Sequence, residues 1–132
     1  MYSKQDLINY RIEKAIDAHK DAELLFNHKS YQSCANRLYY SLYYVISAHL
    51  IHLNFEPKSH AGIKILFHKE LIKTEILEKE VAVVFEILFN LRNDADYIDF
   101  IVVEEKDVVE LLPKSKRIIE NIKEKLLKNL NY

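Results

Sequence analysis

Apolar residues recur along the first 54 positions with a spacing that is typical of amphipathic helices. They are separated by four and then by three residues, which matches the turn of a helix and not the two-residue repeat of a strand. The pattern predicts one helix over residues 3–27 and a second over residues 31–54, with a polar break at residues 27–30. The two stripes are Ile8, Ile12, Ala15, His19, Ala22 and Phe26, and then Cys34, Leu38, Ser41, Val45, Ala48 and His52.

The second helix is expected to end before Pro57, because a proline disfavours helical geometry at the residue that precedes it. Ser59 is a suitable N-cap for a shorter third helix over residues 60–73. Thr74 is predicted to cap a fourth helix that reaches Ile98. The fourth helix carries a heptad stripe: Leu77, Val81, Val84, Leu88, Leu91, Ala95 and Ile98.

The β-branched run at residues 101–103 makes a natural break before a fifth helix that begins near Glu105. Its stripe is Val108, Leu112, Ser115, Ile119, Ile122 and Leu126. Pro113 falls inside this stripe, so it either kinks the helix or marks a second helix start after a short first piece.

These elements predict an all-α protein, built as an antiparallel up-and-down bundle of about five helices with short connections. The chain has one Gly and two Pro, too few turn formers for many short strands. Its 132 residues suit a single domain over residues 1–132 and are too few for two ordinary domains.

Composition narrows the possible functions. The net charge is −1, so any contact with nucleic acid has to come from a local patch. The lone Cys34 excludes an internal disulfide and a cysteine-cluster metal site, and its apolar neighbours favour a buried thiol. His49 and His52 are spaced for one metal ion, but no third ligand is placed beside them, so we expect neither a metal nor a cofactor. Without a membrane-spanning run or a signal-peptide pattern, the protein is expected to be cytoplasmic and to have no membrane partner.

The first candidate site lies near the end of the fourth helix, at residues 91–97. Helical spacing puts Arg92 in line with Phe85, Phe89 and Asp96, which suggests the edge of a groove or of a subunit interface. Arg92 and Asp96 are also one turn apart, so an ordinary surface ion pair is the simpler interpretation.

The second candidate is the tyrosine block at residues 39–44. Tyr39 pairs with Tyr43, and Tyr40 with Tyr44, at one helical turn. The rings can pack between helices with their hydroxyls at the rim, or they can stack against bases in an open cleft. His60, just after the predicted cap, suits either a hydrogen bond near the helix start or a position in a pocket.

Three segments together resemble one known family. They are residues 36–44 (NRLYYSLYY), residues 58–62 (KSHAG) ahead of Phe67, and residues 92–97 (RNDADY). The chain is similar over nearly its whole length to the HEPN superfamily, in particular to small stand-alone prokaryotic HEPN proteins with an arginine followed by Ala-Asp-Tyr. The resemblance implies a helical bundle that dimerises with its arginine-bearing helices across a cleft. It also implies pairing with a small nucleotidyltransferase, often as toxin and antitoxin.

Active members of the family are metal-independent ribonucleases that use an arginine, a polar neighbour, and a histidine after four to six intervening residues. Arg92 matches the arginine and Asn93 the polar neighbour, but Tyr97, Ile98 and Asp99 occupy the three positions open to the histidine. An unperturbed tyrosine titrates near pH 10, far above the range in which histidine exchanges protons. Losing such a group can reduce a rate by roughly 10²–10⁴.

Three hypotheses follow. In the leading one, a HEPN-like dimer binds RNA or a nucleotide-related ligand, works with a nucleotidyltransferase in a toxin–antitoxin-like pair, and has a degenerate ribonuclease motif. The expected ligand-binding residues are then Arg92, Asp96, Tyr40, Tyr44 and His60.

In the second hypothesis, the protein is an active metal-independent endoribonuclease toxin. Its catalytic residues are then Arg92, Asn93 and Tyr97, with His60 as another substitute for the missing histidine. In the third, the tyrosine block and the Phe85–Phe89 stripe form a pure protein-interaction module.

Overall fold

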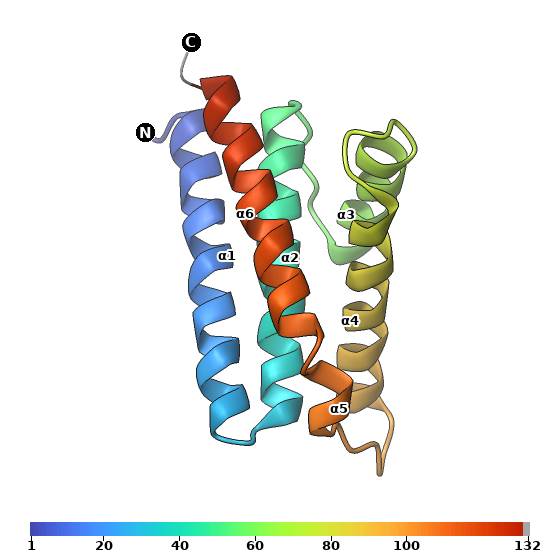
Figure 1. Ribbon diagram of the computed structural model, residues 1–132. Coiled ribbons are helices and arrows are strands. Elements are labelled where there is room, and N and C mark those ends of the chain that lie inside the picture. The colour runs from blue at the N-terminus through green and yellow to red at the C-terminus, as the bar shows by residue number, and fades with distance from the viewer. Residues whose placement is uncertain (131–132) are drawn as a thin grey trace.

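The computed structural model describes the backbone of residues 1–130 and the side chains of residues 1–127 (Figure 1). The elements are α1 (Lys4–Asn27), α2 (Tyr31–His52), α3 (His60–Leu66), the π-helical segment η1 (Phe67–Ile72), α4 (Lys79–Tyr97), α5 (Glu105–Val108) and α6 (Leu111–Leu130). The described residues contain no strand, which confirms the all-α prediction.

The helices form the predicted up-and-down bundle around α2 (Figure 1). α1 and α2 are an antiparallel pair, α6 packs against both, and α4 lies on the other side of α2. The connection between α2 and α3 runs back down beside the bundle, so α3 begins level with the middle of α2 (Figure 1). This return brings the first residue of α3 close to the tyrosine block.

The ends of α1 and α2 follow local hydrogen bonds. α1 begins at Lys4, because the Ser3 hydroxyl accepts from the Asp6 N–H (3.0 Å) and the Asp6 carboxylate accepts from the Ser3 N–H (2.9 Å). α2 ends at His52, two residues before the predicted end. There the Lys4 ammonium donates to the His52 carbonyl (2.9 Å) and to Asn54 Oδ1 (2.7 Å), which ties the start of α1 to the end of α2.

The predicted cap at Thr74 is wrong. The Thr74 hydroxyl donates to the Glu70 carbonyl of the preceding segment (2.7 Å), and α4 starts only at Lys79, after Glu78. Residues 60–72 are helical as predicted, but their second half is a π-helix. Leu77 is still buried, so its apolar signal was correct although it lies outside α4.

Pro113 marks a second helix start. α5 ends at Val108 and α6 begins at Leu111, so Pro113 lies in the first turn of α6, where a proline interrupts no helical hydrogen bond. Most of the predicted stripe is buried, and Leu112 is partly covered.

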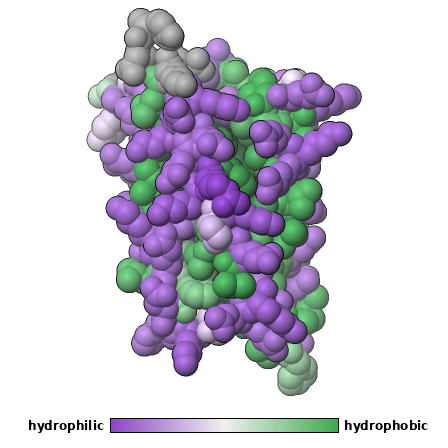
Figure 2. Space-filling view, viewed as in Figure 1, coloured by the Kyte–Doolittle hydropathy of each residue, from purple (hydrophilic) through white to green (hydrophobic). Residues whose placement is uncertain are grey.

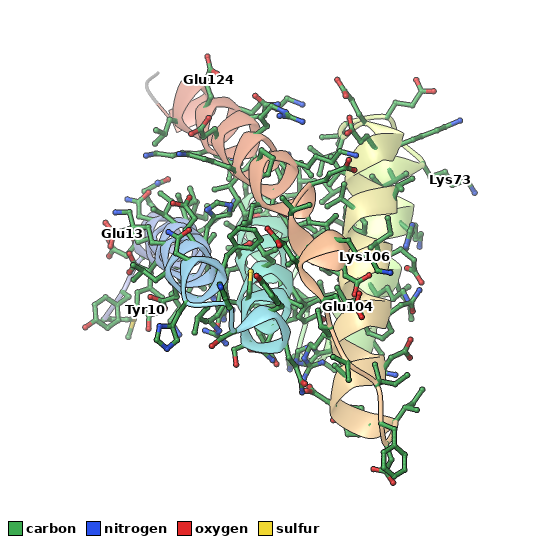
Figure 3. All side chains as sticks on the ribbon, turned by 60° about the horizontal axis from the view of Figure 1, so that its bottom comes forward. Tyr10, Glu13, Lys73, Glu104, Lys106 and Glu124 are labelled. Carbon is green, nitrogen blue, oxygen red and sulfur yellow. The ribbon has the colours of Figure 1, made fainter. Side chains whose placement is uncertain are left out.

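The core lies between α2 and its neighbours. Cys34 is fully buried, and burial raises the pKa of its thiol to about 11, as expected for a structural thiol. The face that α6 presents is mostly hydrophilic, with apolar patches along the edge formed by α3 and α4 (Figure 2). On α1, Tyr10 and Glu13 point away from the bundle (Figure 3). No helix in the described part of the chain has the length and apolar character needed to span a membrane.

The capping box at Ser3 gives a direct test of the fold. Ser3→Ala removes the acceptor for the Asp6 N–H and is expected to lower the free energy of unfolding by about 0.5–2 kcal/mol. Ser33→Ala is the control, because this exposed serine lies inside α2, where alanine favours the helix by a few tenths of a kcal/mol. Urea denaturation followed by circular dichroism measures both, and equal stability of the two variants would contradict a role for the cap.

Candidate functional site

The tyrosine block is divided between the core and the surface. Tyr39 is 1% exposed, and its ring stacks on Phe85 of α4 with centroids 5.5 Å apart and an interplanar angle of 6°. Tyr40, Tyr43 and Tyr44 are only partly buried. Packing in the core therefore describes Tyr39, whereas the other three rings are partly open to solvent.

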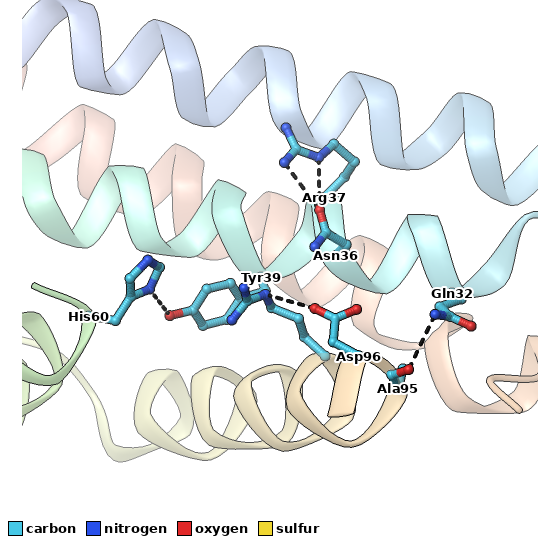
Figure 4. A network of polar contacts seen from close by, with 8 residues as sticks. Gln32, Asn36, Arg37, Tyr39, His60, Ala95 and Asp96 are labelled. Carbon is cyan, nitrogen blue, oxygen red and sulfur yellow. Dashed lines mark hydrogen bonds and ion pairs between the residues drawn. The ribbon is translucent and has the colours of Figure 1, made fainter. Parts of the chain in front are cut away.

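His60 is brought against this block from α3. The predicted cap is confirmed, because the Ser59 hydroxyl accepts from the Gly62 N–H (2.9 Å). A Cβ atom added at Gly62 would lie 3.1 Å from that hydroxyl, so the only glycine of the chain leaves room for the cap. His60 Nδ1 lies 3.0 Å from the Tyr39 hydroxyl (Figure 4). The centroid of the His60 ring is 4.6 Å from that of the Tyr43 ring.

Arg92 faces the same rings from α4. Its guanidinium carbon is 5.2 Å from the ring centroids of both Tyr39 and Tyr40, within the range of cation–π attraction. The predicted ion pair with Asp96 exists, but Nε and Oδ2 are 3.6 Å apart, which is longer than a hydrogen bond (Figure 4). The Arg92 side chain is only 17% exposed, so this is a partly desolvated cation and not an ordinary surface pair.

Arg92 also has unused hydrogen-bonding capacity. Its Nε is buried and faces Asp96, so it is closed to a ligand, whereas no hydrogen bond engages its two terminal nitrogens among the described residues. A guanidinium carries five N–H donors arranged to match a carboxylate or a phosphate. The two terminal NH₂ groups of Arg92 are therefore the donors left for an anionic ligand.

The environment changes the acid–base properties of the site. Burial, and then the positive charge of Arg92, lower the pKa of His60, so the imidazole is mainly uncharged at neutral pH. Burial raises the pKa of Tyr39 to about 12, although Arg92 opposes this shift. Burial also raises the pKa of Tyr43, against the opposing charge of Arg11. Tyr39 and Tyr43 therefore stay protonated while His60 is the group that can titrate near neutrality.

Two further cations contact the rim. The Arg37 guanidinium lies 5.1 Å from the centre of the Tyr40 ring, and Lys14 Nζ lies 5.1 Å from that of Tyr44 and 5.3 Å from that of Tyr10. We call the set Lys14, Arg37, Tyr40, Tyr44 and Arg92 the cation–tyrosine surface. Lys14 and Arg37 were not among the residues predicted for the site. The one-turn spacing of Tyr10 and Lys14 was a signal for this contact, but it gave no indication that α1 meets Tyr44.

Other predicted residues do not share this arrangement. Tyr97 is the last residue of α4 and is 73% exposed. Tyr97 follows Arg92 by five residues, so its side chain leaves α4 about 140° around the helix from that of Arg92. The structure therefore does not bring the two side chains together. Asn93 is partly buried and follows Arg92 by one residue, about 100° further around α4. Phe85 is a core residue at 2% exposure, so the Phe85–Phe89 stripe is wrong as an exposed interface.

The two histidines considered for a metal are on α2, with ring centroids 6.3 Å apart. His49 is buried, and burial lowers its pKa. Within the described residues, no three His, Cys, Asp or Glu side chains gather in a way that could hold a metal ion. The site thus offers an arginine, a histidine and tyrosine rings as its chemical groups.

The fold thus defines a class of protein: a small all-α bundle that holds an arginine between two of its helices. The model of the HEPN domain family matches residues 8–126, and the chain belongs to that family. A UPF0332 protein of Thermotoga maritima is 31% identical over 130 residues, which cover 98% of each chain.

Two proteins of Methanocaldococcus jannaschii that carry the name of putative toxins are similar as well. One is 33% identical over 116 residues, 88% of this chain and 79% of that protein. The other is 28% identical over 115 residues, 87% of this chain and 85% of that protein. The chain thus belongs to the HEPN family and has relatives that are named as toxins.

The electrostatic coupling across the site can be measured. Arg92→Ala removes the positive charge near His60 and is expected to raise the pKa of His60 from its depressed value, while burial keeps it below that of a free imidazole. Titration of the His60 ring protons by NMR measures the shift. Lys14→Ala is the control, and an unchanged His60 pKa in Arg92→Ala would show that the two groups are not coupled.

Proposed function

We propose that this protein is a toxin-type HEPN domain that binds the phosphodiester backbone of RNA at Arg92. The observation that carries the proposal is the state of the Arg92 side chain. It is mostly covered, lies within cation–π distance of two tyrosine rings and is only loosely paired with Asp96. A partly desolvated guanidinium with free donors binds a phosphate more strongly than an exposed one, because water competes less for it.

The surroundings of Arg92 support a nucleic acid over an isolated phosphate ion. Tyr40 and Tyr44 are only partly buried, and exposed parts of aromatic rings can bind unpaired bases by stacking. Arg37 and Lys14 lie against the same rings, so positive charge accompanies the stacking surface. This local arrangement provides the positive charge for binding nucleic acid that the overall charge of −1 does not.

The partners of the protein are part of the proposal. The resemblance to HEPN proteins implies a homodimer and a pair with a small nucleotidyltransferase, and both belong to the proposal. Apolar side chains that follow α4 offer a surface for such contacts, because Ile98, Phe100 and Val102 are 51%, 101% and 74% exposed. Val83 and Ile87 are also exposed, but they lie on the side of α4 turned away from Arg92.

Binding to a single-stranded RNA oligonucleotide of mixed sequence tests the proposed ligand. Arg92→Ala is expected to weaken the affinity by about 10–150-fold, the effect of losing a charge-assisted contact worth about 1.5–3 kcal/mol. It is also expected to reduce the dependence of the affinity on salt. Arg117→Ala, at an exposed position of α6, is the matched control. Unchanged binding by Arg92→Ala with an intact circular dichroism spectrum would contradict the proposal.

Light scattering coupled to size-exclusion chromatography tests the proposed homodimer. Phe100→Asp places a charge in the exposed apolar segment and is expected to shift the wild-type dimer toward monomer. Val83→Asp is the control on the opposite side of α4. A monomeric wild type would refute the homodimer, and dissociation by Val83→Asp alone would move the interface to the outer side of α4.

A further inference from the structure

His60 is the titratable group of the Arg92 site, although it comes from a different helix. Its ring contacts Tyr39, Tyr40 and Tyr43 of α2. The Arg92 guanidinium also contacts the rings of Tyr39 and Tyr40. We propose that His60, held by Tyr39, is the acid–base residue of this site and cleaves RNA bound at Arg92 without a metal ion. The inference rests on the proposed binding of RNA at Arg92.

Tyr39 holds the imidazole in one orientation. Its own ring cannot turn freely, because it is buried and stacked on Phe85 and also contacts Phe89. Its hydroxyl engages His60 Nδ1 at 3.0 Å, and no hydrogen bond to Nε2 occurs within the described residues. His60 as a residue is exposed, so Nε2 is the ring nitrogen left for a ligand. When Nδ1–H donates to the Tyr39 oxygen, Nε2 carries the lone pair that can accept a proton.

The position of His60 is fixed at the backbone as well. It is the first residue of α3, directly after the Ser59 cap, so its backbone cannot move without breaking the hydrogen bond from Gly62 to Ser59. Residues held by packing and by a second hydrogen bond keep the geometry that catalysis needs.

The charges around His60 suit a base. The groups that face it are three tyrosines of α2 and Arg92 of α4. Tyr39 keeps its proton at neutral pH and so acts as an anchor and not as a competing base. His60 is mainly neutral there, because burial and Arg92 disfavour its charged form. Tyr97 has neither arrangement, since it is exposed and leaves α4 on another side than Arg92.

The reaction balances without a further reagent. His60 Nε2 accepts the proton of a ribose 2′-hydroxyl, whose oxygen forms a bond to the adjacent phosphorus. The bond between phosphorus and the 5′-oxygen breaks, and that oxygen takes a proton from water. The hydroxide left behind takes the proton back from the His60 imidazolium. Arg92 stabilises the negative charge on the phosphoryl oxygens during the step. The products are a 2′,3′-cyclic phosphate and a 5′-hydroxyl.

The experiment compares cleavage of a single-stranded RNA oligonucleotide with that of a DNA of the same sequence, both in EDTA. Wild type is expected to cleave only the RNA, because the DNA lacks the 2′-hydroxyl. His60→Asn is expected to reduce the cleavage rate by about 10²–10⁴-fold and to change RNA affinity by less than about threefold. His68→Asn is the matched control, since His68 is an exposed histidine of η1 that contacts Phe67. Cleavage at the wild-type rate by His60→Asn, or no cleavage by wild type between pH 5 and 8, would overturn the inference.

The pH profile separates catalysis from a structural role. For wild type the rate is expected to rise with pH through the depressed pKa of His60 and then to level off. Tyr39→Phe keeps the ring but removes the acceptor for Nδ1–H, which disfavours the imidazolium and moves the midpoint to lower pH with a reduced rate. Tyr97→Phe is expected to leave the profile unchanged. A Tyr39→Phe midpoint equal to that of wild type, or loss of cleavage only in Tyr97→Phe, would contradict the role of the His60–Tyr39 pair.

Failure of this inference can be distinguished from failure of the proposed function. Arg92→Ala is expected to lose both RNA affinity and cleavage. If Arg92→Ala binds RNA as wild type does, the proposed binding site is wrong. If it loses affinity while His60→Asn still cleaves, only the assignment of His60 is wrong.

Discussion

The packing of α2 against the surrounding helices is the constraint from which the other features follow. Thirteen of its 22 residues are buried, because α1, α4 and α6 all contact it. Most buried polar groups have a hydrogen-bond partner, and the Ser41 hydroxyl donates to the Leu38 carbonyl at 2.6 Å. The buried His49 of the same helix is an exception, because neither of its ring nitrogens has a partner among the described residues. The Tyr39 hydroxyl does have a partner, which is His60. The contact with His60 therefore offsets the cost of burying the Tyr39 hydroxyl.

The Arg92 site is a consequence of the same packing. A desolvated cation is costly unless nearby groups offset the loss of water, and here two tyrosine rings and a loosely paired carboxylate do so. These contacts leave donors of the guanidinium free, which is the property that a phosphate ligand would use. The site thus holds the positive charge of Arg92 in place and leaves some of its N–H donors without a partner in the described part of the chain.

The HEPN motif lacks its histidine along the sequence, but the folded protein places another histidine near Arg92. Catalytic arrangements depend on geometry and not on the order of residues along the chain. The expected positions after Arg92 lie toward the exposed end of α4, and the tyrosine there does not face the tyrosine block. His60 comes from the other end of a returning connection and contacts the rings on which Arg92 rests. A residue from one helix can therefore supply a group that the motif on another helix lacks.

The sequence by itself determined the all-α class, most helix boundaries and the Ser59 cap, since these depend on periodicity and on hydrogen bonds between near neighbours. It misplaced the start of α4, because whether Thr74 caps forward or bonds back to Glu70 depends on the path of the preceding π-helix. It also identified Arg92, the tyrosine block and His60 as separate candidates. Only the tertiary structure decided that these three meet while Tyr97 stays apart, because distances between helices depend on how the whole bundle packs and not on spacing within any one of them.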